Sequence, residues 1–198
     1  MSGDVETKAS LRIALKAALA AVPQDRWEAE SLAACERAAA LPAFIGAGVV
    51  LLYMPIPREL DVGPLARAAF AAGKGVAVTR ADWAGRTLTP VRIAAWDEPM
   101  AVNRLGIREP GPEAASVHLA TVDLIIVPGL GFDANGGRLG RGAGFYDRLL
   151  ARPDCRAVKV GIGLDAQVVG RVPMEGWDVP LDAVVTPTRT LVAAGRGA

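Results

Sequence analysis

The sequence predicts a single α/β domain in which a mostly parallel, Rossmann-like sheet lies between two helical layers, giving a three-layer α/β/α arrangement. Apolar runs of strand length alternate with stretches of helical periodicity, as is typical of this class. The 198 residues are long enough for one well-buried domain and short for two. The sequence contains no internal repeat or low-complexity linker, so we expect one domain over residues 1–198.

Four segments carry apolar residues at helical spacing. In the first of them, Leu11 and Leu15 are one turn apart and Pro23 ends the pattern. After the third, Gly73 is suited to cap the helix end. Asp61, at the start of that third segment, is a candidate N-cap. The predicted helices cover residues 4–22, 24–41, 61–72 and 145–151.

Continuous apolar runs predict strands that are covered on both faces of the sheet. The clearest run ends at Pro55, and another is followed at once by Pro128. Residues 98–113 contain several prolines and glycines and are predicted to be a loop. The predicted strands cover residues 47–54, 75–79, 88–94, 122–127, 158–162 and 183–186.

Two strand exits are candidate ligand sites. In parallel α/β sheets, ligands bind beyond the carboxyl ends of the strands. The chain leaves one buried strand after Met54 and another after Val127. We therefore expect functional residues just beyond these two positions.

Composition excludes several function classes. A net charge of +1 gives no electrostatic reason for binding nucleic acid or an anionic membrane. The start lacks the layout of a secretory signal, and no apolar run approaches the about 20 residues that span a bilayer. Cys35 and Cys155 are expected to be unpaired thiols, as is usual in the cytoplasm. We expect a cytoplasmic protein.

The segment from Gly129 to Gly144 contains seven glycines and leads into a predicted helix. Glycine permits positive φ and close approach of a ligand to the backbone. Successive N–H groups at a helix start can bind an anion. Arg138 and Arg141 add charges for phosphate oxygens, and Asp147 could hold a hard cation beside them. The alternative is a glycine-rich turn that only connects strand and helix.

Neither of the common nucleotide-binding signatures is present. The chain has no Gly-x-x-x-x-Gly-Lys-Ser/Thr motif, and Phe145 stands where the dinucleotide fingerprint starting at Gly140 needs its third glycine. A P-loop NTPase and an NAD enzyme are therefore disfavoured.

The same segment resembles the signature of the 5-formyltetrahydrofolate cyclo-ligases. The family pattern Arg-Leu-Gly-x-Gly-x-Gly-Tyr-Tyr-Asp is similar to Arg138-Leu-Gly-Arg-Gly-Ala-Gly-Phe-Tyr-Asp147, with Phe145 as a departure. Lys8-Ala-Ser-Leu-Arg12 is similar to the family's Lys-x-x-Leu-Arg. Further similar blocks cover residues 53–61, 167–173 and 177–186, so the resemblance spans roughly residues 8–186.

This resemblance implies a reaction as well as a fold. Such enzymes use ATP and Mg²⁺ to convert 5-formyltetrahydrofolate to 5,10-methenyltetrahydrofolate, releasing ADP and phosphate. The formyl oxygen takes the γ-phosphate, and the folate's position-10 nitrogen attacks the resulting imino-phosphate. The expected partners are therefore ATP and a reduced formylated folate, with no nucleic acid and no membrane. We expect a monomer.

The resemblance also implies roles for individual residues. Met54 and Glu59 would bind the folate, the glutamate through the pterin's N–H donors. Asp147 and Asp178 would bind Mg²⁺, with Asp182 as the rival of Asp178. Arg141 and Tyr146 are the catalytic candidates. The implied ATP-binding residues are Lys8, Arg12, Arg138, Leu139, Gly140, Arg141, Gly142, Ala143, Gly144, Phe145 and Tyr146, of which Arg141, Gly142, Ala143, Gly144 and Phe145 would also line the folate side.

Two alternative functions stay open. Trp177 and Pro187 depart from the residues common in the family, which leaves room for a paralogue that binds folate or nucleotide without turnover. The glycine-rich loop recognises phosphate rather than pterin, so a ligase for another formylated amine is also compatible. His118, the sole histidine, lies outside the similar blocks, and we expect no histidine-based catalysis. The tryptophans Trp27, Trp83, Trp96 and Trp177 are expected to pack rather than to stack on a base.

Overall fold

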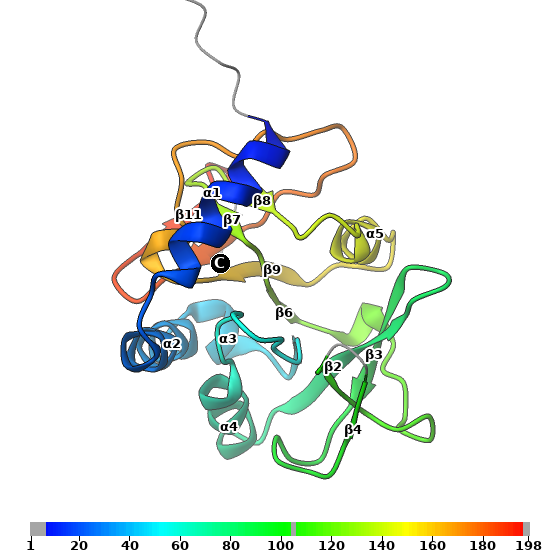
Figure 1. Cartoon of the computed structure of the whole chain (residues 1–198). Helices are drawn as coiled ribbons and strands as arrows, with labels where there is room; N and C mark the ends of the chain where they lie inside the picture. The colour runs from blue at the N-terminus through cyan, green and yellow to red at the C-terminus, as the bar shows by residue number, and fades with distance from the viewer. Residues whose placement is uncertain (1–6, 104–105, 196–198) are drawn as a thin grey trace, which may run out of the picture.

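The computed structural model describes residues 7–103 and 106–195, and a seven-stranded sheet forms its centre (Figure 1). The inner strands are parallel, and each edge strand is antiparallel to its neighbour. This confirms the predicted α/β class. The strand order is β11 (Thr190–Val192), β10 (Ala183–Val185), β9 (Val158–Ile162), β6 (Leu124–Val127), β1 (Val49–Leu52), β2 (Gly75–Asp82) and β3 (Thr87–Arg92).

The direction of strand order reverses between β1 and β6. From β1 the sheet continues to β2 on one side, whereas β6, β9 and β10 follow one another on the other side. In open parallel sheets, the crevice at such a reversal is the usual ligand site. The chain exits after Leu52 and Val127 therefore lie side by side where a ligand is expected.

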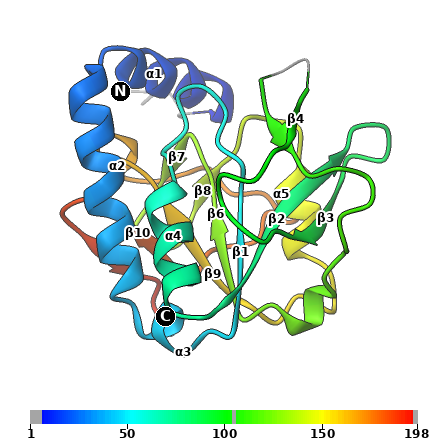
Figure 2. The same ribbon diagram turned by 90° about the horizontal axis from the view of Figure 1, so that it is seen from below.

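Helices cover both faces of the sheet (Figure 2). On one face, Val50 and Leu52 of β1 belong to the same buried cluster as residues of α2, α3 and α4. On the other face, Leu51 packs in a cluster with Leu149 and Leu150 of α5. Alternate residues of one strand thus enter opposite layers. The bounds are α2 (Gln24–Ala39), α3 (Pro42–Gly46), α4 (Gly63–Ala71), α5 (Phe145–Leu150) and the 3₁₀ turns η1 (Leu119–Thr121) and η2 (Asp165–Gln167).

The first helix, α1 (Lys8–Ala20), lies beside a small hairpin instead of on the main sheet (Figure 1). The hairpin is formed by β7 (Gly131–Phe132) and β8 (Arg138–Leu139), inside the glycine-rich segment. Leu11 and Leu15 of α1 pack against Leu139 of β8. The Thr7 side chain accepts a hydrogen bond from the Ser10 N–H and caps the helix. This packing brings the start of α1 to the glycine-rich loop.

Several predicted boundaries needed correction. Residues 4–6 of the first predicted helix lie outside the described residues. The second predicted helix ends earlier, and the separate α3 follows it. The predicted loop 98–113 contains a two-stranded ladder, formed by β4 (Ala101–Val102) and β5 (Arg108–Glu109). The hairpin β7–β8 and the edge strand β11 were missed, because strands of two or three residues carry no readable periodicity.

Smaller expectations can also be compared with the structure. The N-cap of α4 is Val62, although the Asp61 side chain accepts a hydrogen bond from the Gly63 N–H. Both cysteines are free thiols, and burial raises the pKa of Cys35 to about 12. Within residues 7–103 and 106–195, no helix has the length and apolar character needed to cross a membrane.

Gly136 lies at the turn of the β7–β8 hairpin and allows one stability prediction. Its φ is +82°, and a Cβ atom there would overlap the carbonyl oxygen of Leu181. We expect Gly136→Ala to lower the free energy of unfolding by about 2–4 kcal/mol, because it adds backbone strain and a collision. Gly170→Ala is the control, since nothing lies within 4 Å of its added Cβ. Urea denaturation measures both, and equal midpoints for the two variants would refute the prediction.

Candidate active site

A cavity of about 1130 Å³ opens at the carboxyl ends of β1 and β6. Its walls come from the start of α1, the exits of both strands, the β2–β3 hairpin, the glycine-rich loop between β8 and α5, and the loop that precedes β10. Every residue assigned above to ATP, folate, catalysis or Mg²⁺ lines this cavity, with the rival Asp182 as the exception. Segments that are far apart in the sequence therefore meet in one place.

The loop between β8 and α5 presents a run of free backbone donors. Within the described chain, the N–H groups from Gly140 to Asp147 have no hydrogen-bond acceptor. Gly142 and Gly144 have φ of +109° and +71°, a region that glycine enters without a steric penalty. Such a run of unpaired N–H groups in a concave wall suits an anion with several oxygens.

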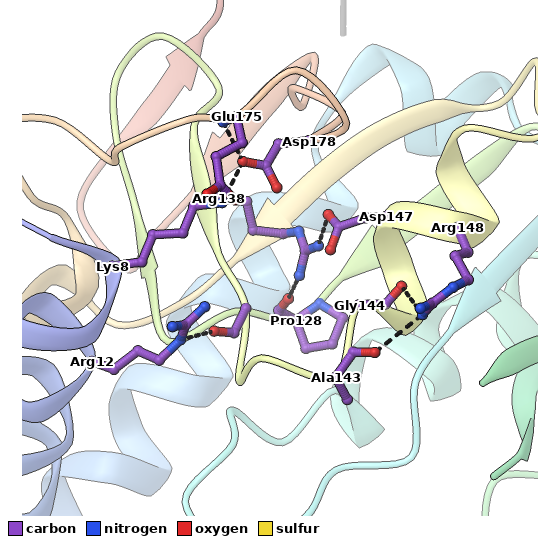
Figure 3. Close-up of polar contacts among 11 residues, drawn as sticks. Lys8, Arg12, Pro128, Arg138, Ala143, Gly144, Asp147, Arg148, Glu175 and Asp178 are labelled. Atoms are coloured by element: carbon purple, nitrogen blue, oxygen red, sulfur yellow. Dashed lines mark hydrogen bonds and ion pairs between the residues drawn. The ribbon is translucent and has the colours of Figure 1, made fainter. Parts of the chain in front are cut away.

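Arg138 and Asp147 form a buried ion pair in this wall (Figure 3). Nη2 of Arg138 donates to Oδ1 of Asp147 at 2.5 Å, and the arginine side chain is only 4% exposed. The guanidinium carbon also lies 5.7 Å from the centre of the Tyr146 ring. Oδ2 of Asp147 has no partner among the described residues. Arg138 thus fixes the Asp147 carboxylate and leaves one of its oxygens available.

A second ionic group joins α1 to the loop before β10. Nζ of Lys8 lies 2.5 Å from Oδ2 of Asp178 and 2.7 Å from Oε2 of Glu175 (Figure 3). Burial lowers the pKa of Lys8, but the hydrogen bonds and charges of the two carboxylates outweigh burial, so this pKa is raised. Oδ1 of Asp178 has no partner among the described residues. Glu175 was missed in the sequence, where nothing distinguishes it from a surface acid.

Asp182 lies at the amino ends of the parallel strands, opposite to the carboxyl ends where the cavity opens. It immediately precedes β10, at the amino end of that strand. Its Oδ2 accepts a hydrogen bond of 2.8 Å from the Lys159 N–H and joins β9 to β10. Of the two rival carboxylates, only Asp178 therefore faces the cavity.

Arg141 crosses the cavity to the exit of β1. Its Nε lies 2.9 Å from Oε1 of Glu59, whose side chain is 11% exposed. Burial raises the pKa of Glu59, and the charge and hydrogen bond of Arg141 counter part of that rise. Met54, also on this side, is buried in the cavity wall. The phosphate-binding candidates and the folate-binding candidates are thus in direct contact.

Several aromatic side chains line the cavity. The Tyr146 hydroxyl is buried, and burial raises its pKa more than a contact with Thr79 lowers it. Trp83 meets Phe145 edge to face, with ring centres 5.1 Å apart. Trp83, 43% exposed, lines the cavity while it packs against Phe145, whereas Trp177, 69% exposed, lines the cavity contrary to the expectation that it packs. The other two tryptophans, Trp27 and Trp96, are buried as expected.

Two other candidates have limited roles. The Leu139 side chain is buried against α1, and its carbonyl oxygen accepts a hydrogen bond from the Leu130 N–H. His118 is exposed and does not line the cavity.

The sequence model of the 5-formyltetrahydrofolate cyclo-ligase family matches residues 4–187. The chain belongs to this family. It is 36% identical over 174 residues to the cyclo-ligase of Escherichia coli. This alignment covers 86% of this chain and 94% of the relative. It is 32% identical to the cyclo-ligase of Mycolicibacterium smegmatis over 191 residues, which covers 94% and 97% of the two chains.

A solved structure named as a folate synthetase has a similar fold. The structure of Aquifex aeolicus 5,10-methenyltetrahydrofolate synthetase superposes with a TM-score of 0.81 at 32% identity, over 96% of this chain and 95% of that one. The family match of residues 4–187 includes α1, the glycine-rich loop and the segment around Asp178. All three of these cavity walls thus belong to the cyclo-ligase region of the chain.

Proposed function

We propose that the protein catalyses the ATP- and Mg²⁺-dependent cyclisation of 5-formyltetrahydrofolate to 5,10-methenyltetrahydrofolate, with release of ADP and phosphate. The observation that carries this proposal is a single cavity that combines free backbone donors with a buried carboxylate, Glu59, on its other side. Its volume of about 1130 Å³ lies above the about 300–1,000 Å³ usual for one ligand. That size suits two substrates held together.

The triphosphate is proposed to lie on the loop between β8 and α5. The N–H groups from Gly140 to Asp147 would donate to its oxygens. Arg12 and Arg141, which line the same wall, would add positive charge. Lys8 lies at the far end, where its ammonium group can exchange a carboxylate for a phosphate oxygen.

Asp147 and Asp178 fit a magnesium site. Each has one carboxylate oxygen in a contact and one without a partner in the described chain. No group of three or more candidate ligands from His, Cys, Asp and Glu occurs in those residues, so phosphate oxygens and water would complete the six oxygen positions that Mg²⁺ prefers. The bound ion would neutralise charge on the phosphates.

The folate is proposed to bind between Glu59 and the aromatic wall. Ionised Glu59 would accept hydrogen bonds from the pterin N–H groups, and Met54 and Phe145 would contact the ring. The raised pKa of Tyr146 keeps its hydroxyl protonated at neutral pH, so it serves as a hydrogen-bond donor and not as a base. Tyr146 can thus orient the formyl oxygen toward the terminal phosphate.

The proposed reaction needs alignment more than acid–base chemistry. The formyl oxygen attacks the γ-phosphorus and ADP leaves, which turns a poor leaving group into a phosphate ester. The folate's position-10 nitrogen then attacks the activated carbon, the C–O bond to phosphate breaks, and the proton of that nitrogen leaves with the phosphate. Arg141, held at 2.9 Å from Glu59, lies between the two substrates and can stabilise charge that develops on the transferred group.

The structure offers no specific support for the two alternative functions. Pro187, one of the two departures, does not line the cavity, and its carbonyl oxygen accepts hydrogen bonds from Arg37. Trp177 does line the cavity but leaves the carboxylate of Asp178 accessible there. We also propose a monomer in the cytoplasm, where the two free thiols would stay reduced.

The activity is tested by mixing purified protein with 5-formyltetrahydrofolate, ATP and Mg²⁺ while following methenyl absorbance in the near ultraviolet. We expect absorbance to rise only when all three are present, with one ADP released per methenyl group formed. Folate binding without any turnover would instead support a non-catalytic paralogue. Turnover of ATP with another formylated amine, but not with the folate, would support the other alternative.

A further inference from the structure

Arg148, on the helix that follows the glycine-rich loop, contacts that loop directly. Nη1 of Arg148 donates to the carbonyl oxygens of Ala143 and Gly144, at 3.1 and 3.0 Å (Figure 3). It forms no ion pair within residues 7–103 and 106–195. We propose that Arg148 is a positioning residue that holds the loop in the shape that binds the triphosphate. This inference rests on the proposed function.

The geometry of the peptide bond connects these contacts to the phosphate site. In a trans peptide unit, the C=O and the following N–H point in opposite directions. When Arg148 holds the carbonyls of Ala143 and Gly144, it therefore also sets the directions of the Gly144 and Phe145 N–H groups. Both of these N–H groups belong to the run without acceptors in the described chain.

The helix that carries Arg148 is anchored in the core by its neighbouring residues. The next two residues, Leu149 and Leu150, are buried beneath the sheet with 2% and 3% exposure. Gly144, whose φ is +71°, has no side chain, so packing of its own side chain cannot fix the loop at the point where Arg148 holds it. Arg148 also lines the cavity, and its guanidinium group supplies hydrogen bonds to two neighbouring carbonyls of the loop.

A second arginine acts at the other end of the loop. Nε of Arg12, from α1, donates to the carbonyl oxygen of Gly140 at 2.9 Å (Figure 3). The loop is thus tied at its start to α1 and at its end to α5, and Arg141 between these points reaches Glu59. A loop held at both ends loses less conformational freedom when it binds ATP.

The test compares Arg148→Met, which removes the donors but keeps an unbranched side chain, with Arg148→Lys. For Arg148→Met we expect the KM for ATP to rise by about tenfold, because the loop loses two hydrogen bonds that a charged group donates. The kcat and the KM for the folate should change by less than about twofold. Arg148→Lys should recover most of the loss, because an ammonium group can also donate to both carbonyls. The control is Arg152→Met, whose guanidinium pairs with Asp154 and does not line the cavity.

Salt separates positioning from a direct contact with phosphate. The tenfold ratio between wild type and Arg148→Met should persist at high ionic strength if it reflects the loop's shape, whereas a screened charge effect would vanish there. A vanishing ratio, or unchanged kinetics in Arg148→Met, would overturn the inference. A parallel fall of kcat/KM for both substrates together with a lower melting temperature would also overturn it, as a sign of general destabilisation. A wild-type protein without activity would instead refute the proposed function.

Discussion

Asp147→Asn is expected to lower turnover by about three orders of magnitude, which corresponds to about 4 kcal/mol of lost transition-state stabilisation. An amide oxygen is a weaker magnesium ligand than a carboxylate, and the phosphates would lose part of their neutralisation. Asparagine keeps an oxygen that can accept the hydrogen bond from buried Arg138, so the fold should survive. Steady-state methenyl formation across a magnesium titration measures the effect.

Asp154→Asn is the matched control for this variant. Asp154 also pairs with an arginine, Arg152, but it does not line the cavity. Its substitution should leave turnover unchanged. Circular dichroism melting of both variants shows whether they fold. Wild-type activity in Asp147→Asn would remove Asp147 from the proposed metal site.

Arg141→Ala is expected to lower kcat/KM for ATP by about 10²- to 10³-fold, the usual loss when one group that stabilises transition-state charge is removed. The same variant should also change the pH dependence of folate binding. Arg141 is the partner that counters the effect of burial on the pKa of Glu59. Without it, the Glu59 pKa should rise further.

The direction of the pH effect follows from the charge that the proposal requires on Glu59. The carboxylate must be ionised to accept the pterin's hydrogen bonds, so folate affinity is lost as the pH falls through the pKa of Glu59. Because that pKa is higher in Arg141→Ala, the loss should begin at a higher pH than in wild type. Calorimetric titration with 5-formyltetrahydrofolate at several pH values measures this.

Glu59→Gln separates the two effects of Arg141. This variant has no carboxylate to titrate, so its weakened folate binding should not show the same fall with decreasing pH. If Arg141→Ala and wild type lose folate affinity at the same pH, the Arg141–Glu59 pair has no influence on substrate binding. If ATP dependence is also unchanged, Arg141 plays no part in nucleotide use.

Much of the sheet could be predicted because buried parallel strands leave a strong local pattern. Residues 158–162 were predicted as a strand and form β9 over the same range. The run before Pro128 was predicted within two residues of the observed β6. The short β7 and β8 carry no such pattern, because two residues are too few to show a periodicity.

The candidate site also has a part that local sequence predicts and a part that it does not. The glycines between positions 129 and 144, with Arg138, Arg141 and Asp147 nearby, pointed to a phosphate site from local sequence, because a concave run of N–H groups is built from consecutive residues. The choice between Asp178 and Asp182 remained open in the sequence, since the two lie four residues apart. The structure favours Asp178, because Asp178 lines the cavity, whereas Asp182 lies at the amino ends of the strands, away from it.

The amino-acid sequence alone therefore determined the α/β class, the two strand exits and the prediction that the loop binds phosphate. These features are local, arising from apolar periodicity and from glycines next to arginines. Only the tertiary structure decided that Lys8 meets Glu175 and Asp178, that Arg141 reaches Glu59, and that Arg148 turns back to the loop. Such contacts depend on how distant segments pack around the reversal in strand order, and residue spacing does not record this.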